Sequence, residues 1–151
     1  ILELGIICSH LGEVKKGILL LKKSLEIDPF NHETKFNLSQ MQIFNKELKE
    51  GWSNFRSRWL YHNFKSIPLK STRKQLTDLK ELRNVLIWAE QGIGDQIMYG
   101  SIFSEISNLS KKVIVKFDKR LIKIFERKHK NINFVDNDTK VNEDEYDAHL
   151  P

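Results

Sequence analysis

The sequence predicts two kinds of structure in one chain: an all-helical part over residues 1–63 and part of a parallel-sheet α/β unit over residues 84–151. The first prediction rests on small and apolar residues that recur at a step of 34 residues, such as Gly17 and Gly51. The second rests on short apolar segments that alternate with amphipathic ones after residue 84. Residues 64–83 are rich in lysine and lack a regular pattern, which predicts a basic connector between the two parts.

The 34-residue step is the period of the tetratricopeptide repeat, a helix–turn–helix unit. The segment LGIICSHLGEVKKGILLLKKSLEIDPFN resembles such a repeat. NLSQMQIFNKELKEGWSNFRSRWLYH resembles a weaker second copy, with Arg58 where a small side chain is expected. The small side chains that let the helices of the first copy approach are Gly5, Gly17 and Ser24. The large side chains expected to fill the space between these helices are Leu4, Leu11, Leu21 and Leu25.

The helix boundaries follow from local signals. Apolar residues recur at helical spacing over 18–25, with lysines between them. Pro29 cannot continue that helix, and Asn31 or His32 can open the next one.

An aromatic stripe follows in the second copy, where Trp52, Phe55 and Trp59 are spaced i, i+3, i+7. Such a stripe could be a platform on which a ligand stacks. It could also seal the last helix of the array, because the ends of a helical repeat array need a cap. We favour the seal.

After residue 84 the predicted order is strand, helix, strand, helix, strand. NVLIWA, KVIVKF and INFV predict strands at 84–89, 112–117 and 132–135. The stretch 95–109 predicts one helix, whose apolar residues at helical spacing are Ile97, Met98, Ile102, Ile106 and Leu109. The stretch 119–129 predicts a second helix, whose inward side chains are Leu121, Ile124 and Phe125.

A βαβαβ order implies a parallel sheet with right-handed crossovers, which is half of a Rossmann-like domain. Three strands make an incomplete sheet of this kind. Parallel sheets usually have both faces buried, which three strands alone do not achieve. We therefore expect the sequence to be part of a longer protein, cut short at its carboxyl end.

The stretch AEQGIGDQIMYG, residues 89–100, follows the first predicted strand of the α/β part. Ligands of open α/β sheets bind beyond the carboxyl ends of the strands, so its position suits a site. It lacks the third glycine of a dinucleotide fingerprint, the Gly-Lys-Ser/Thr of a P-loop and the GxSxG of a nucleophile elbow. Asp95 makes a bound phosphate unfavourable in this turn, because two anions would compete for one helix N-terminus.

The spacing leaves two interpretations of Asp95 open, a helix cap and a general base beside a hydroxyl. Glu90 either anchors the loop by accepting backbone N–H bonds or contacts an acceptor, and we favour anchoring. Gln91 and Gln96 could hydrogen-bond a sugar, although solvation of the loop and helix start explains them as well. Trp88 is expected to be a core residue of a buried strand rather than a stacking platform.

Composition excludes several classes of protein. The net charge is +5, and because residues 136–151 hold six acids and one lysine (−5), the remainder carries +10. No compact Arg/Lys tract with interleaved aromatics occurs, which disfavours nucleic acid as a partner. The longest apolar runs are too short to form a transmembrane segment. The five histidines are scattered without a metal-binding motif, so no metal is expected. The lone Cys8 favours a reducing compartment, and we expect a cytoplasmic location.

Several segments together resemble one bacterial family. Helical repeats are followed by a GW..F..RW-like stretch over 51–59, then by LIWAEQGIGDQI, and then by DEYDAHLP, which is similar to a D-x-x-I-P stretch. This family joins tetratricopeptide repeats to a glycosyltransferase-like domain of the heptosyltransferase type, which has the GT-B fold. The resemblance covers nearly the whole chain.

The resemblance implies metal-independent transfer of a sugar from a nucleotide donor to a hydroxyl acceptor. Asp95 would be the general base in this reaction. The residues expected to contact substrate are Glu90, Gln91, Gly92, Gly94 and Gln96. The sugar nucleotide would be a substrate and no cofactor is expected. Its pocket in such enzymes lies mostly in the second Rossmann half, so the active site would be incomplete in these residues. The repeats would bind a protein or peptide partner, or the acceptor. The alternative is a non-catalytic scaffold that binds proteins through the repeats.

Overall fold

The computed structural model describes residues 1–76 and 83–151 and divides into two compact units, Ile1–Lys65 and Ser66–Pro151. The first unit is helical, and the second contains a parallel sheet of five strands. This combination is compatible with the expected class of helices followed by an α/β part. Residues 77–82 of the expected basic connector, Lys80 among them, lie outside the described ranges.

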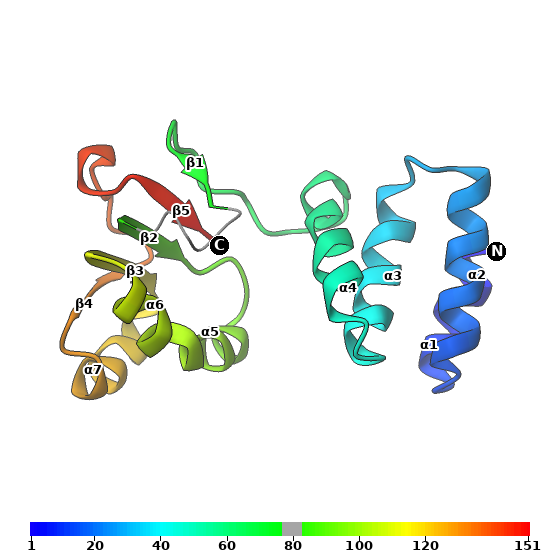
Figure 1. Ribbon diagram of the computed structural model, residues 1–151, viewed down its shortest axis with the longest axis horizontal. Helices are drawn as coiled ribbons and strands as arrows, with labels where there is room; N and C mark the ends of the chain where they lie inside the picture. Colours follow the sequence, from blue (N-terminus) through cyan, green and yellow to red (C-terminus); the bar gives the residue numbers. More distant parts are fainter. Residues whose placement is uncertain (77–82) are drawn as a thin grey trace. The chain divides into compact units, whose positions relative to one another are not determined.

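The first unit consists of two helical hairpins (Figure 1). The first hairpin is α1 (Leu2–His10) and α2 (Val14–Ile27). The second is α3 (His32–Phe44) and α4 (Leu48–Phe55), which continues into a 3-10 helix, η1 (Arg56–Leu60). The side chain of Asn31 accepts a hydrogen bond from the backbone N–H of Thr34 at 2.8 Å, which caps α3 and confirms the predicted start of this helix.

Both hairpins contain the same turn, one repeat apart. Gly12 and Lys46 have left-handed backbones, with φ of 76° and 65°. The amide of Glu13 donates to the carbonyl of Cys8 at 2.8 Å, and the amide of Glu47 donates to the carbonyl of Gln42 at 2.8 Å. These bonds close the helix ends as in a Schellman motif. The backbone conformation of the turn therefore repeats at the same 34-residue interval as the sequence.

The core of the helical unit lies where α2 packs on α3. Its buried residues are Ile18, Leu21, Leu38 and Met41. Gly5 lies against Leu21, since a Cβ on it would come within 2.8 Å of the leucine Cγ. The prediction that Leu4 and Leu11 fill the space between helices is wrong, because they are 57% and 70% exposed. Leu38, one repeat after Leu4, is buried by α2, whereas no described helix covers the corresponding side of α1.

The aromatic stripe is only partly the expected seal. Phe55 and Trp59 are half-buried, and the ring of Phe55 lies 5.7 Å from that of Phe36, whereas Trp52 is 44% exposed. Arg58, which replaces a small residue of the first repeat, is 6% exposed. Its guanidinium lies 4.3 Å from the ring centre of Phe55 and 4.5 Å from that of Trp59, so stacking on rings accommodates the large side chain.

The sheet of the second unit has the order β1-β5-β2-β3-β4, and every neighbouring pair is parallel. Its strands are β1 (Lys74–Gln75), β2 (Asn84–Trp88), β3 (Lys112–Phe117), β4 (Ile132–Asp136) and β5 (Ala148–Leu150). The three predicted strands are confirmed as β2, β3 and β4. Two further strands, β1 and β5, extend the sheet on the other side of β2, and β1 lies within the segment expected to be a connector.

The predicted helix over 95–109 is two helices, α5 (Ile93–Tyr99) and α6 (Phe103–Leu109), joined by a 3-10 turn, η3 (Gly100–Ile102). The turn changes the helical phase, so the predicted apolar face is wrong except at Ile106, which is buried. The exposed members of that face are Ile97, Met98, Ile102 and Leu109. Phe103 takes the inward position, and Gly100 lies against the ring of Phe125.

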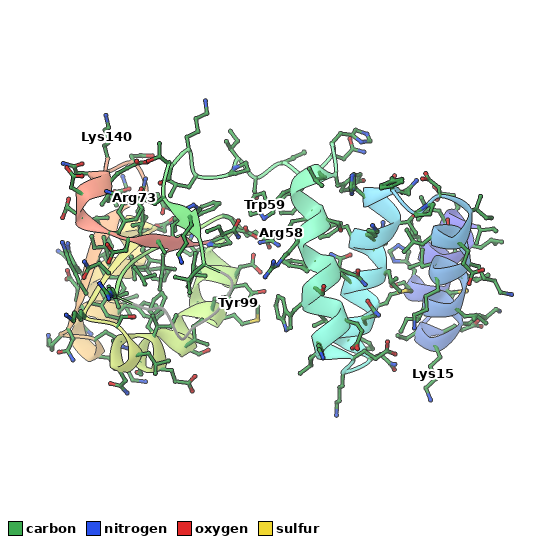
Figure 2. All side chains as sticks on the ribbon, turned by 45° about the horizontal axis from the view of Figure 1, so that its top comes forward. Lys15, Arg58, Trp59, Arg73, Tyr99 and Lys140 are labelled. Atoms are coloured by element: carbon green, nitrogen blue, oxygen red, sulfur yellow. The ribbon has the colours of Figure 1, made fainter. Side chains whose placement is uncertain are left out.

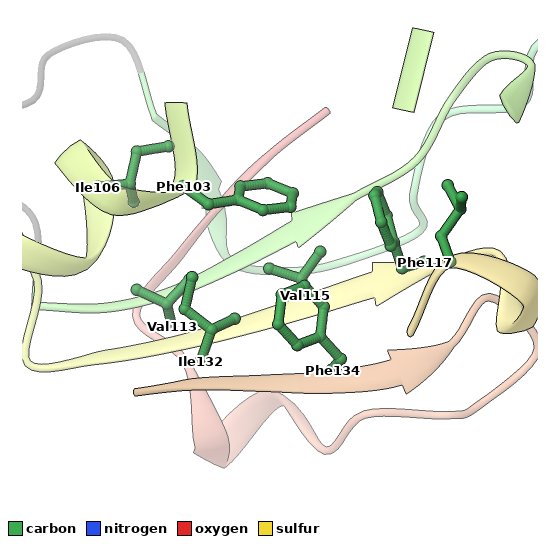
Figure 3. Close-up of a cluster of buried hydrophobic side chains, with 8 residues drawn as sticks. Phe103, Ile106, Val113, Val115, Phe117, Ile132 and Phe134 are labelled. Carbon is green, nitrogen blue, oxygen red and sulfur yellow. The ribbon is translucent and has the colours of Figure 1, made fainter. Parts of the chain in front are cut away.

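The third helix, α7 (Lys119–Lys128), follows β3, and a short 3-10 helix, η4 (Glu143–Glu145), precedes β5. Leu121 and Phe125 face the core as predicted, but Ile124 is 59% exposed and Ile122 packs inward instead. Helices α6 and α7 cover one face of the sheet (Figure 1), and Figure 3 shows Phe103 and Ile106 of α6 next to the strand side chains of this core. The buried residues of this core are Phe103, Ile106, Val113, Val115, Phe117, Leu121, Ile132 and Phe134.

Candidate functional site at the carboxyl end of β2

The strand order reverses at β2. From β2 the chain builds β3 and then β4 outward on one side, and β5 then pairs with the opposite edge of β2. Ligands of open parallel sheets bind in the crevice beyond the carboxyl ends of the two strands at such a switch point. The loop 89–92 leaves β2 at this place, so the topology positions the glycine-rich turn where a ligand site is expected.

Helix α5 begins at Ile93, with Gly92 as its N-cap residue and no side-chain cap hydrogen bond. Asp95 is in the first turn and is half-buried. Its carboxylate folds back towards the loop, since a Cβ on Gly92 would lie 3.7 Å from Oδ2. Within the described ranges, Asp95 forms no hydrogen bond or ion pair. The geometry therefore disfavours the helix-cap interpretation and leaves the carboxylate available to a ligand.

The two glycines of the turn differ in their surroundings. A Cβ on Gly94 would have no atom of residues 1–76 or 83–151 within 4 Å, so the backbone of α5 is uncovered by the described residues at this position. A Cβ on Gly92 would meet the Asp95 carboxylate alone among the described residues. Both glycines leave the carboxylate approachable from the loop side.

Gln96 has a structural role that the sequence did not indicate. Its side chain is 9% exposed, its Nε2 donates to the carbonyl of Gln91 at 3.2 Å, and its Oε1 accepts from the backbone N–H of Asp118 at 2.9 Å. Gln96 thus ties the loop after β2 to the start of α7 after β3. This geometry favours a positioning role over the expected contact with substrate.

Glu90 and Gln91 belong to the same connected loop. Gln91 Nε2 donates to the carboxylate of Glu90 at 3.3 Å, and the hydroxyl of Ser66 donates to the carbonyl of Glu90. The loop is therefore held through both side chain and backbone. The expected anchoring of the loop by backbone N–H bonds to the Glu90 carboxylate stays a prediction, because this carboxylate accepts from the side chain of Gln91 and the bond from Ser66 goes to the backbone carbonyl.

Trp88 and His149 lie side by side on β2 and β5, and both are buried. Trp88 Nε1 donates to His149 Nδ1 at 3.1 Å, so the neutral ring carries its proton on Nε2. Burial lowers the pKa of His149, while a hydrogen bond with the backbone of Arg73 and the charge of Glu143 oppose this shift. The pair is part of the core beneath the switch point, as expected for Trp88.

Sequence reasoning missed Ser66, Asp118 and His149 as residues that shape this region. Asp118 comes directly after β3, as Ala89 comes directly after β2, and the carboxyl ends of neighbouring parallel strands meet at one edge. The position of Asp118 directly after a predicted strand could therefore have indicated that it lies near this site. Nothing in the sequence near Ser66 points to a residue 24 positions away.

The remaining features of the described part of the chain concern metals, membranes and a cavity. No group of three or more His, Cys, Asp or Glu side chains there is placed to hold a metal ion. No helix within residues 1–76 and 83–151 is long and apolar enough to cross a membrane. In the helical unit, a cavity of about 340 Å³ lies between α1 and α3. Its polar lining includes Ser9, His10, Asn37 and Gln40.

The fold and the loop define a chain of helical hairpins followed by a parallel-sheet α/β unit with an approachable carboxylate at its switch point. Comparison with protein-family models, with curated proteins and with solved structures finds no match.

Proposed function

We propose that the chain is part of a tetratricopeptide-containing, glycosyltransferase-like protein of the heptosyltransferase type, whose Ser66–Pro151 unit supplies the acceptor side of the transfer. The observation that carries the proposal is Asp95, a half-buried carboxylate at the switch point that is bonded to no described residue. A location in the cytoplasm is part of the same proposal.

Asp95 would take the proton of an acceptor hydroxyl while the hydroxyl oxygen attacks the anomeric carbon of the donor sugar. The bond between that carbon and the nucleotide's terminal phosphate oxygen then breaks, and the nucleotide leaves with the bonding electrons. Gly92 and Gly94 would let the acceptor approach, and Gln96 would hold the loop in place. The donor would bind mostly to a second Rossmann half, as in the enzymes that the sequence resembles.

The test is Asp95→Asn in the full-length protein, with sugar nucleotides as donors. Loss of the base is expected to lower the transfer rate by about 10²- to 10⁴-fold. Asp138→Asn is the matched control, because Asp138 is an exposed acid in the loop after β4. Transfer by Asp95→Asn within twofold of the unsubstituted protein would remove the proposed base.

The cavity between α1 and α3 supports a second candidate, a scaffold that binds an extended peptide in this groove. Its lining combines polar side chains such as Asn37 with apolar ones such as Phe44, which is 77% exposed. Peptides selected from a random library on the whole chain should lose affinity on Phe44→Ala and keep it on Phe30→Ala. Phe30 is a suitable control because it is 80% exposed in the turn between α2 and α3 and does not line the cavity. Peptides that bind both variants equally would exclude this groove as the binding surface.

A further inference from the structure

A second cavity lies in the α/β unit, on the face of the sheet that α6 and α7 do not cover. Its volume is about 720 Å³, which is in the range of small-molecule sites. Leu86 of β2 and Tyr146 form part of its floor and belong to the cluster that also contains Ile114. The neighbouring residues Val113 and Val115 belong to the core on the opposite face of the sheet. The sheet therefore lies between this cavity and the helices.

Three lysines from three different segments line the cavity. Lys116 is on β3, Lys70 precedes β1, and Lys140 is in the loop between β4 and η4. Figure 2 shows the side chain of Lys140 extending from this loop. None of the three forms an ion pair or side-chain hydrogen bond with a residue in 1–76 or 83–151.

Neighbouring cations are paired, which makes the three lysines distinctive. Lys112, on the same face of β3 as Lys116, donates to Glu145 at 3.1 Å. Arg73 donates to Asp144 at 3.4 Å and to the backbone carbonyl of Glu143. Glu145 and Asp144 therefore pair with Lys112 and Arg73, and not with the three lysines of the cavity.

Among the described residues that line the cavity, Glu143 is the one carboxylate. It accepts hydrogen bonds from the backbone amide and the hydroxyl of Thr72. These bonds, with a further one from Ser71, lower the pKa of Glu143, so it is ionised at neutral pH. Three ammonium groups against one carboxylate give the described part of the lining a charge of +2.

We propose that this cavity binds a small organic phosphate whose non-phosphate part is apolar or planar. The ammonium groups of Lys70, Lys116 and Lys140 would contact the phosphate oxygens, since lysine binds phosphate as a point charge. Leu69, Leu86 and Val141 would contact the apolar part. This site is distinct from the Asp95 turn and does not depend on the proposed transfer reaction.

The test uses the whole 151-residue chain with phenyl phosphate as the probe and amide chemical shifts as the readout. Saturable shifts are expected at Leu86, Lys116 and Val141, with binding tighter than that of inorganic phosphate or phenol. The absence of saturable shifts there would overturn the proposal. Equal affinity for inorganic phosphate would contradict the role of the apolar floor.

Lys116→Gln and Lys140→Gln should each weaken phenyl phosphate binding by at least about fivefold, because each removes one nearby positive charge. Lys123→Gln is the matched control, since Lys123 is exposed on α7, on the helix-covered side of the sheet. The control should bind as the unsubstituted chain does. Equal weakening in all three variants would show a general effect of net charge and would overturn the site.

Discussion

At the scale of single residues, Lys46 has a backbone that does not suit its side chain. It lies in the turn between α3 and α4 with φ of 65°, whereas glycine occupies the corresponding position of the first hairpin. A non-glycine residue in this region is strained by about 1–2 kcal/mol, and glycine in turn has more entropy in the unfolded chain. We therefore predict that Lys46→Gly raises the free energy of unfolding by about 0.5–1 kcal/mol in urea titrations.

Lys49→Gly provides the control for this prediction, because Lys49 is exposed in α4. Glycine costs up to about 1 kcal/mol in a helix, so this variant should not gain stability. If both lysine variants lose stability, the left-handed turn is not a source of strain.

His149 and His129 give the fold a pH dependence. Burial lowers the pKa of each in the folded protein, and Lys128 adds to the shift at His129. When the pH falls below about 6.5, the ordinary histidine pKa, the unfolded chain binds more protons than the folded protein. The stability is therefore fully present above that pH and decreases as the pH falls towards the lowered folded-state values.

The measurement is the urea midpoint of the α/β unit between pH 7.5 and 5.5. We predict a midpoint that falls with pH and a smaller fall in His149→Gln, whose side chain no longer titrates. An unchanged dependence in that variant would mean that His149 is not kept neutral by the fold.

At the scale of elements, the break between α5 and α6 depends on Gly100. A Cβ at this position would lie 2.5 Å from Cε1 of Phe125. Gly100→Ala should therefore lower the free energy of unfolding by about 1–3 kcal/mol, because the aromatic core must shift. Gly94→Ala is the matched control, since a Cβ there meets no atom of the described residues within 4 Å and alanine favours helix by about 0.5–1 kcal/mol.

The variants Gly100→Ala and Gly94→Ala also distinguish an effect on stability from an effect on transfer. Gly94→Ala should be as stable as the unsubstituted protein or more stable, and yet slower in transfer if an acceptor approaches α5 at this position. Thermal unfolding of the two variants in parallel gives the stability comparison. Destabilisation by Gly94→Ala and tolerance of Gly100→Ala would contradict the described packing of α5 and η3.

The elements also show what sequence patterns can predict. Strands β2, β3 and β4 were predictable because their apolar runs are long and continuous. Strands β1 and β5 have two and three residues, and β1 has only polar ones, so they produce no pattern. The inward face of 95–109 was mispredicted because a uniform helical period cannot anticipate the 3-10 turn at Gly100.

The site was predictable in its position and less so in its contacts. A glycine-rich turn after a strand indicates the carboxyl edge of a sheet, and Asp95 lies there. The role of Gln96 depends on Asp118, 22 residues away on another strand's end, and no local pattern reports such a pair. The switch point itself became visible only with β5, whose pairing with β2 is a property of the folded sheet.

At the scale of the whole molecule, the two units have different candidate roles: a groove of helical hairpins and a switch-point loop on a parallel sheet. We propose that Asp95 acts on an acceptor rather than on the helix that carries it. These two roles predict different combinations of stability and rate.

The most direct measurement determines both quantities for Asp95→Asn in the full-length protein: the free energy of unfolding and the rate of sugar transfer. We predict a change in stability of less than about 0.5 kcal/mol, as for a substitution away from structural contacts, together with a rate at least about 100-fold lower. A loss of about 1 kcal/mol in stability with an unchanged transfer rate would identify Asp95 as a helix cap and contradict the proposed base.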